Sequence, residues 1–445
     1  MHLRTLSGHH APWGAAVEVT NSTESGRPIG LRDSAWERDF NLLWTGSAIS
    51  QIGTMNATLT APLLALLLTN SPVFAGWVTA AGTLPRILLH LPVGVLVDRS
   101  DGHRVMIVSL VVRAALAILL TASVILFGGL PSLLLLAVAA QGVCLVFYNT
   151  AETTIIPRLI PNIHLPQAMA KNEGRIHAAG LLGRPLGGLL FDMSRWLPFA
   201  ADALASSVSI FALLRMRKQE FKPSAERRPL RLATLTRELQ AGLAFLSGDR
   251  FLRPVLIVCT LANFFFQTLG LLLVLLAHQQ RLSSLAIGCL VASTALGGVL
   301  GSLTAPYLLR KVSPQRAVVM CVWSWLLLSF AVAVVDHNSS FYLLLVLPLA
   351  WGGIGYTGAH INVVLALYQA ECVPKELLGR VTSASRFFSG SAVPLGALAS
   401  GYIVAGLGTQ GAAVLVAGAV AVGALILAIS ATPARATEQR PEFTT

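Results

Sequence analysis

Residues 104–127 read RVMIVSLVVRAALAILLTASVILF, a run of apolar side chains in which Arg113 is the one charge after the opening arginine. A helix needs about 20 apolar residues to cross the hydrocarbon core of a membrane. Comparable runs recur along the chain, and Ala412–Ile429 lacks the alternation of apolar and polar residues that a membrane β-barrel needs. The run therefore predicts one of several membrane-spanning helices.

The composition supports this prediction. The 445 residues are 54% hydrophobic and 12% charged, with a mean hydropathy of +0.69, which is more apolar surface than a soluble fold of this length can cover. The net charge of +12 would suggest a nucleic-acid partner in a soluble protein. Here the basic residues lie between the apolar runs, so we expect a lipid bilayer and no nucleic acid as partner. The five cysteines lie in or beside apolar runs, so no disulfide framework is expected.

The predicted architecture is an all-α integral membrane protein of about twelve transmembrane helices. The expected spans are 41–69, 73–97, 104–127, 132–156, 171–192, 198–216, 252–277, 284–309, 317–335, 341–371, 381–405 and 410–431. They divide the chain into a disordered tail (1–39), a six-helix half (40–216), a central loop (217–250), a second six-helix half (251–432) and a short tail (433–445).

The distribution of Lys and Arg predicts the orientation. The loops after the even-numbered spans carry many basic residues between Arg99 and Arg386, whereas the opposite loops carry only Arg195 and Arg281. Cytoplasmic loops are the ones enriched in Lys and Arg. We therefore expect a multi-pass protein of the cell membrane, the inner membrane in a Gram-negative cell, with both termini and the central loop cytoplasmic.

An internal repeat supports two pseudo-symmetric halves. An offset of 213 residues relates four pairs of residues, Asn149 and Asn362, Pro161 and Pro374, Gly183 and Gly396, and Gly188 and Gly401. Parallel six-helix halves are the arrangement of transporters that rock around a site at the middle of the membrane.

The turn after the second span reads Gly94-Val-Leu-Val-Asp98-Arg99-Ser-Asp101-Gly102-His103-Arg104. Here the chain resembles the major facilitator superfamily, whose loop motif begins Gly-x-Leu-Ala-Asp-Arg. The resemblance assigns Gly94, Asp98, Arg99 and Arg104 to a cytoplasmic gate, and Gly94 should let another helix approach closely. The family's usual glycine is Asp101 here.

Four further stretches resemble the exporter branch that contains macrolide-efflux and enterobactin-exporter proteins. They are SPVFAGWVTAAGTLPRILLHLPVGVLVDR (71–99), YNTAETTIIPRLIP (148–161), GLLGRPLGGLLF (180–191) and VPKELLGRVTSASR (373–386). The resemblance implies secondary active efflux of a small organic molecule, such as an antibiotic, secondary metabolite or siderophore, by alternating access. No Walker motif is present, so a proton gradient is the expected energy source.

In the fifth span, Gly183, Gly187 and Gly188 have the small-residue spacing that allows close helix packing. The stretch resembles the antiporter motif Gly-Pro-x-x-Gly-Gly, with Arg184 at the position of the proline. Tight packing and a role in coupling are both consistent with these glycines.

Charged and titratable residues within spans are functional candidates, because a charge at the centre of a membrane helix costs about 2.5–3.5 kcal/mol. Arg86, Arg113 and Arg184 predict an electropositive first half and an anionic or polyhydroxylated solute rather than a cationic drug. Arginines that snorkel or tie helices together are the alternative. The candidates for proton coupling are Glu152, Asp202, His90 and His360.

The solute cavity should lie between the halves. Polar and aromatic residues within the spans that could line it are Gln51, Asn149, Asn263, Gln267, Asn362, Trp351 and Tyr356, beside Arg86 and Arg113.

Two other functions remain open: uptake of a small anionic solute, and a membrane sensor that binds a solute without moving it. An enzyme is not expected, since no nucleophile motif, nucleotide loop or metal-ligand cluster is visible. We expect no cofactor, no metal and a monomer.

Overall fold

The computed structural model describes residues 30–217, 232–249, 251–334 and 345–430, which form helices joined by short turns and contain no strand. In chain order the α-helices are α1 (Gly30–Thr69), α2 (Pro72–Leu88), α3 (His90–Asp98), α4 (Gly102–Phe127), α5 (Pro131–Leu159), α6 (Leu165–Met193), α7 (Leu197–Leu214), α8 (Leu232–Gly248), α9 (Leu252–Gln279), α10 (Ser284–Lys311), α11 (Pro314–Val334), α12 (Leu347–Cys372) and α13 (Lys375–Ser430). Eight of the described helices are long and apolar enough to cross a membrane.

Apart from α8, the described helices lie in the intervals predicted from the sequence, with three differences. Helix α1 begins at Gly30, so the predicted tail of 1–39 is wrong at its boundary, and residues 1–29 and 431–445 lie outside the described residues. The second span is divided into α2 and α3 at Leu89. The last two spans form one element, α13, which Gly408 breaks with a φ of 69° that favours glycine.

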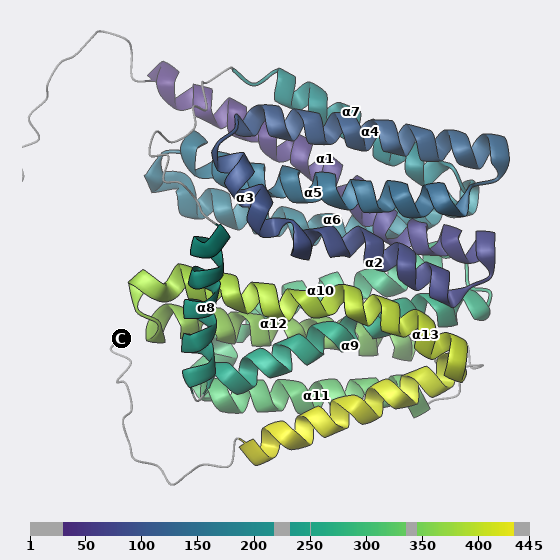
Figure 1. Cartoon of the computed structure of the whole chain (residues 1–445), viewed down its shortest axis with the longest axis vertical. Coiled ribbons are helices and arrows are strands. Elements are labelled where there is room, and N and C mark those ends of the chain that lie inside the picture. Colours follow the sequence, from purple (N-terminus) through teal and green to yellow (C-terminus); the bar gives the residue numbers. More distant parts are fainter. Residues whose placement is uncertain (1–29, 218–231, 250, 335–344, 431–445) are drawn as a thin grey trace, which may run out of the picture.

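The helices form two bundles, α1–α7 and α9–α13, which lie side by side with their axes roughly parallel (Figure 1). We name the two ends of this assembly by what they carry. The α8 face holds α8 and the turns at Arg99–Asp101 and Val373–Pro374. The far face holds the turns at Asn70–Ser71 and Gln280–Ser283.

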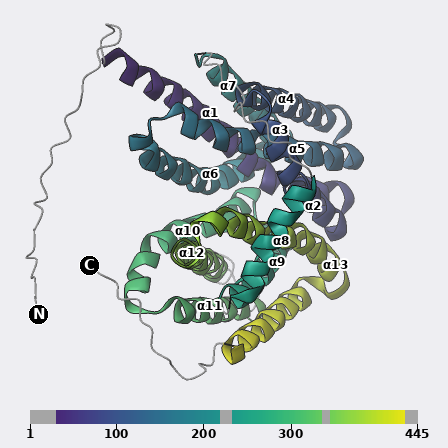
Figure 2. The same ribbon diagram turned by 60° about the vertical axis from the view of Figure 1, so that its left-hand side comes forward.

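Helix α8 lies across the ends of the other helices rather than along them, as Figures 1 and 2 show. The predicted central loop of 217–250 therefore contains a helix, although residues 218–231 lie outside the described residues. Gly242 fixes this crossing, because a Cβ there would collide with the backbone carbonyl of Arg380 in α13. The small residue thus lets α8 rest directly on the start of α13.

Polar side chains at the turns explain where several helices begin. Ser71 caps α2 by accepting a hydrogen bond from the backbone N–H of Phe74 at 3.3 Å. Asp101 caps α4 by accepting one from the backbone N–H of His103 at 3.0 Å. Such side chains satisfy backbone donors that have no partner within the helix. The acidic residue at the family's glycine position therefore starts α4.

The 213-residue repeat appears as equivalent contacts in the two bundles. Gly183 of α6 packs on the backbone of Ile52 in α1, where a Cβ would lie 2.8 Å from the carbonyl oxygen. Gly396 of α13 packs in the same way on the backbone of Phe264 in α9. The repeat thus places a glycine at the same helix crossing in each half.

Candidate functional site

The two halves meet along two seams, α6 against α10 and α2 against α13. On the first seam, Gly188 lies against the backbone carbonyl of Ser284, and Gly288 lies so near α6 that a Cβ would be 2.9 Å from Cα of Pro185. These backbone approaches lie toward the far face. They show that α6 and α10 are tightly closed there.

The same seam widens toward the α8 face. A Cβ at Gly180 would lie 3.4 Å from Cβ of Ala295, which is ordinary contact, and one at Gly298 would lie 4.0 Å from Cε1 of His177. One turn further along α6, a Cβ at Gly174 would meet nothing within 4 Å. Helices α6 and α10 therefore diverge steadily from the far face to the α8 face.

The second seam has the same asymmetry. A Cβ at Gly76 of α2 would lie 2.9 Å from the carbonyl oxygen of Ala397, and one at Gly401 of α13 would lie 2.7 Å from that of Pro72. Toward the α8 face, a Cβ at Gly94 would meet nothing within 4 Å. The prediction that another helix approaches Gly94 closely is therefore wrong for this conformation, because the halves are apart at that level.

The hydrophobic cores show the same asymmetry between the far face and the α8 face as the two seams. At the far face one core joins both halves and includes Leu63 of α1, Leu273 of α9 and Trp351 of α12. Toward the α8 face each half has a core of its own, one around Met106 and the other around Val318. Burial of apolar surface between the halves therefore holds the far face shut and leaves the α8 face open.

A buried ion pair joins three helices of the first half. The guanidinium of Arg113 in α4 lies 2.5 Å from Oδ1 of Asp202 in α7, and it also donates to the hydroxyl of Ser50 in α1 at 3.0 Å. Gly53 makes room for this pair, since a Cβ there would lie 2.6 Å from Oδ1 of Asp202. Asp202 is 1% exposed, and its Oδ2 has no hydrogen-bond partner among the described residues.

The placement of Arg113 corrects one prediction. The sequence analysis put Arg113 on the wall of the solute cavity, but its side chain is buried and its charge is balanced by Asp202. The sequence could not reveal this partner, because Asp202 lies near the end of a different span. Arg113 therefore adds no net charge to a cavity.

A second buried ion pair joins α5 and α6. Glu152 contacts Arg175 through both carboxylate oxygens, with Oε1 at 2.9 Å from one terminal nitrogen and Oε2 at 3.0 Å from the other. Both side chains are nearly inaccessible. Glu152 was predicted from the sequence as a candidate and Arg175 was not, although a basic residue in the next span was the available signal.

The remaining predicted cations have different surroundings. Arg184 reaches across the α6–α10 seam and donates to the carbonyl of Val291 and the hydroxyl of Thr294, both at 3.4 Å. Arg86 and His90 are exposed and lie on either side of the break between α2 and α3. Among the described side chains, no carboxylate forms an ion pair with Arg86.

The repeat-related asparagines face the space between the halves. Asn149 of α5 is exposed and lies thirteen residues after Leu136, and Asn362 of α12 is exposed and lies thirteen residues after Leu349. Thirteen residues turn a helix by about 220° beyond full turns, so each amide points away from an exposed leucine of the lipid-facing side. Gln51 and Gln267 are half-buried.

Two other predicted cavity residues are held in helix packing. Asn263 donates to the carbonyl of Ser389 at 3.1 Å and so ties α9 to α13. Trp351 is 2% exposed and stacks on Phe266 with ring centroids 4.8 Å apart. Its side chain lies in the far-face core that joins the two halves, so the prediction that it lines an open cavity is wrong in this conformation.

His360 and Tyr356 form a unit with Thr304 of α10. The hydroxyl of Thr304 lies 3.0 Å from the Tyr356 hydroxyl and 3.3 Å from Nε2 of His360. Nδ1 of His360 lies 3.0 Å from the backbone carbonyl of Tyr356. His360 is 2% exposed, so it is a hydrogen-bonded residue of the α10–α12 interface.

The gate motif lies at the α8 face. Asp98 is the last residue of α3, and its side chain lies outside the described residues. Arg99 is exposed, and Arg104 pairs with Asp101 at 3.2 Å on the surface. Nε2 of His103 lies 2.9 Å from the carbonyl of Leu213, which ties this turn to α7.

A carboxylate links the two halves at the far face. Both oxygens of Asp192, at the end of α6, accept hydrogen bonds of 2.8 Å from the backbone N–H groups of Ser284 and Leu285, which begin α10. A negative charge at the start of a helix also interacts favourably with the helix dipole. This contact crosses the seam, and the sequence analysis did not identify its role.

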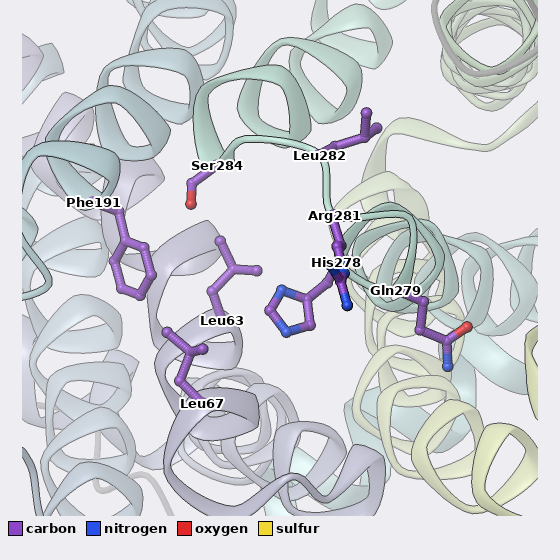
Figure 3. Close-up of a pocket in the computed structure, with 8 residues that line it drawn as sticks. All are labelled: Leu63, Leu67, Phe191, His278, Gln279, Arg281, Leu282 and Ser284. Carbon is purple, nitrogen blue, oxygen red and sulfur yellow. The ribbon is translucent and has the colours of Figure 1, made fainter. Parts of the chain in front are cut away.

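A pocket of about 470 Å³ lies beside this contact at the far face. Figure 3 shows the imidazole of His278 between the leucines of α1 and the end of α9. The lining residues come from α1, α6, α9, the turn before α10 and the first residue of α10, and they are Leu63, Leu67, Phe191, His278, Gln279, Arg281, Leu282 and Ser284. The pocket is therefore a hollow at the closed end of the seam.

Among the described residues, no group of three or more His, Cys, Asp or Glu could hold a metal ion.

Comparisons with known proteins agree with this geometry. The chain is 23% identical over 373 residues to macrolide efflux protein A of Streptococcus pyogenes, covering 82% of this chain and 89% of that protein. It is 24% identical over 353 residues to the multidrug efflux pump Tap of Mycolicibacterium fortuitum, covering 76% of this chain and 83% of that protein.

Solved structures share the fold. The nucleoside transporter NupG matches with a TM-score of 0.68 and 14% identity over 89% of this chain and 99% of that chain. A bacterial homologue of the iron transporter ferroportin in its inward-facing state matches with a TM-score of 0.64 and 14% identity, over the same shares. The model of the Major Facilitator Superfamily matches residues 43–393. The chain therefore belongs to the major facilitator superfamily, and it is a multi-pass membrane transporter of that family.

Proposed function

We propose that this protein is a proton-coupled exporter of a small organic molecule that works by alternating access, with the α8 face in the cytoplasm. The observation that carries the proposal is the asymmetry of the two seams, which are closed by backbone contacts at Gly188 and Gly401 and open at Gly174 and Gly94. Between the described helices, the two halves are open to a solute at the α8 face and closed at the far face in this conformation. Both curated relatives described above are named as efflux proteins.

The orientation rests on charge. Lys and Arg gather in the turns of the α8 face and are scarce in those of the far face, where Arg195 and Arg281 stand alone. Basic loops stay on the cytoplasmic side. Loading from the cytoplasm and release at the far face then amount to export.

Asp202 is the best candidate for the proton-carrying group. It is buried among three helices, it has one cationic partner, and its Oδ2 has no hydrogen-bond partner among the described residues. A proton on Oδ2 would neutralise the carboxylate and weaken its hold on Arg113, which also bonds to Ser50 of α1. Protonation would therefore loosen α4 from α7, which is the kind of change that alternating access requires.

The other candidates fit this role less well. Glu152 has both oxygens bonded to Arg175, and His360 has both ring nitrogens within hydrogen-bond distance of a partner. A change of protonation in Glu152 or His360 would disturb hydrogen bonds that are already complete. Asp202 is thus the residue to test first.

The test uses the full chain in proteoliposomes with an imposed pH gradient. Radiolabelled erythromycin, rhodamine 6G and carboxyfluorescein serve as neutral-to-cationic, cationic and anionic solutes. We expect gradient-driven movement of at least one solute, and we expect Asp202→Asn to abolish it while leaving exchange of that solute at equal pH. Glu173→Gln, an exposed acid of α6, is the control. Binding without movement would favour a sensor, and gradient-driven movement by Asp202→Asn would reject Asp202 as the proton site.

A further inference from the structure

Helices α2 and α13 bring two arginines from different halves to the same depth. The two helices are in contact at Gly76 and Ala397, and they run in opposite directions between the two faces. Arg86 lies ten residues after Gly76, and Arg386 lies eleven residues before Ala397. At 1.5 Å per residue both arginines are about 15 Å from that contact, on its α8-face side.

Arg86 points between the halves rather than into lipid. It lies two residues from both Leu84 and Leu88, and residues two apart lie on nearly opposite sides of a helix. Those leucines are exposed on the lipid-facing side, with exposed fractions of 44% and 63%. Arg86 is itself exposed, so its guanidinium faces the open space between the halves.

Arg386 of α13 also lies opposite the lipid-facing side of its helix. It lies nine residues, or two and a half turns, before Leu395, whose 59% exposure marks the lipid-facing side of α13. Arg386 is exposed and therefore faces the same open space as Arg86.

The described side chains give these arginines no acidic partner. The ion pairs among those side chains are Arg104 with Asp101, Arg113 with Asp202, and Arg175 with Glu152. Two guanidinium groups that face the space between the halves, without an acidic partner among the described side chains, form a site of strong positive potential. A planar guanidinium also matches the geometry of a carboxylate or a phosphate.

We propose that Arg86 of α2 and Arg386 of α13 together bind the anionic group, a carboxylate or a phosphate, of the solute that this protein exports. The site exists while the α8 face is open and has one arginine in each half. Without an anion the two like charges repel and keep the halves apart at that level; a bound anion cancels the repulsion and lets the α8 face close. This inference rests on the proposed export function and names its substrate class.

The binding test uses the full-length protein in a neutral maltoside detergent, with carboxyfluorescein as the anionic probe and rhodamine 6G as the cationic probe, followed by fluorescence anisotropy. We expect Arg86→Gln and Arg386→Gln each to weaken carboxyfluorescein binding about tenfold, as loss of one charge-assisted contact does. Neither variant should weaken rhodamine 6G binding. Arg253→Gln, an exposed arginine at the α8-face end of α9, should change neither.

Each other outcome overturns the proposal. Absence of carboxyfluorescein binding to the wild type would do so, as would equal weakening for both probes or an unchanged affinity in both variants. Competition by added phosphatidylglycerol alone, with no competition by soluble benzoate or phenyl phosphate, would assign the site to lipid headgroups instead. The proteoliposome assay tests the export function separately. If the wild type moves rhodamine 6G but binds no anion, the proposed export function stands and the proposed anion site is rejected.

Discussion

Asp192 in the amino-terminal half accepts a hydrogen bond of 2.8 Å from the backbone N–H of Leu285 in the carboxy-terminal half. Asp249 makes the same kind of cap at 2.7 Å to the backbone N–H of Leu252, but on the helix that follows it in the same half. The two caps are chemically alike and differ in whether they cross between the halves. Comparing the two residues therefore distinguishes a contact that only stabilises a helix, at Asp249, from one that also holds the far face closed, at Asp192.

We predict that Asp192→Ala opens the far face. Loss of such a cap costs about 1 kcal/mol, which shifts a two-state population about fivefold. Spin labels on Leu130 and Leu407, both exposed at the far face in different halves, report the opening as a longer distance in a cysteine-free background. Asp249→Ala should lower the thermal stability by a similar amount without lengthening that distance. Equal label distances in the two variants would show that the Asp192 contact does not hold the far face closed.

The buried pair of Glu152 and Arg175 predicts a strongly non-additive stability change. Glu152→Gln leaves a guanidinium buried without its counter-charge, which costs about 3–5 kcal/mol. The double variant Glu152→Gln with Arg175→Gln should recover a large part of that loss, because no unpaired charge remains. Thermal unfolding in detergent measures each variant. Additive losses would mean that the pair is not coupled.

The glycines of the two faces predict opposite conformational shifts. Gly188→Leu forces a side chain onto the carbonyl of Ser284, so the labels at Leu130 and Leu407 should move apart. Gly94→Leu meets open space in this conformation, but it obstructs closure of the α8 face and should trap the present state with a short far-face distance. Gly174→Leu, which also meets open space, tests whether α6 has to close in the same way. A short distance for Gly188→Leu would contradict the alternating model.

Cys372 tests the orientation. It is exposed at the end of α12 on the α8 face, whereas Cys144, Cys259 and Cys321 are buried. In a Cys289→Ser background, a membrane-impermeant maleimide should label inside-out vesicles and leave intact cells unlabelled. Labelling of intact cells would place the α8 face outside and reverse the proposed direction of transport.

Much of the fold followed from local patterns. Apolar runs longer than the membrane thickness placed the helices, because backbone groups in lipid must be satisfied within the helix. The offset between Gly183 and Gly396 anticipated the two halves, and their equivalent crossings on α1 and α9 appear in the structure. Helix ends were less predictable: α1 begins at Gly30 and α8 crosses the bundle end, since packing decides these features.

The sequence was sufficient to predict which types of residue belong to the candidate site. It was not sufficient to predict which side chains they contact. Glu152, Asp202, Arg86 and Arg113 stood out because charges within spans are rare. Which of them face each other depends on the rotation and neighbours of each helix, and those arise from contacts distant in the chain. Arg113 is therefore a buried structural cation beside Asp202, although its sequence position is as central as that of Arg86.

By itself, the sequence determined that this protein crosses the membrane repeatedly as two related halves, because hydropathy and repeated glycines are properties of the chain alone. Only the tertiary structure decided which charges are neutralised and which face is closed, since each of these depends on helices separated by many residues packing at a particular rotation and depth. That packing leaves Arg86 and Arg386 without an ion-pair partner among the described side chains, and it closes the seam at Asp192 and Leu285.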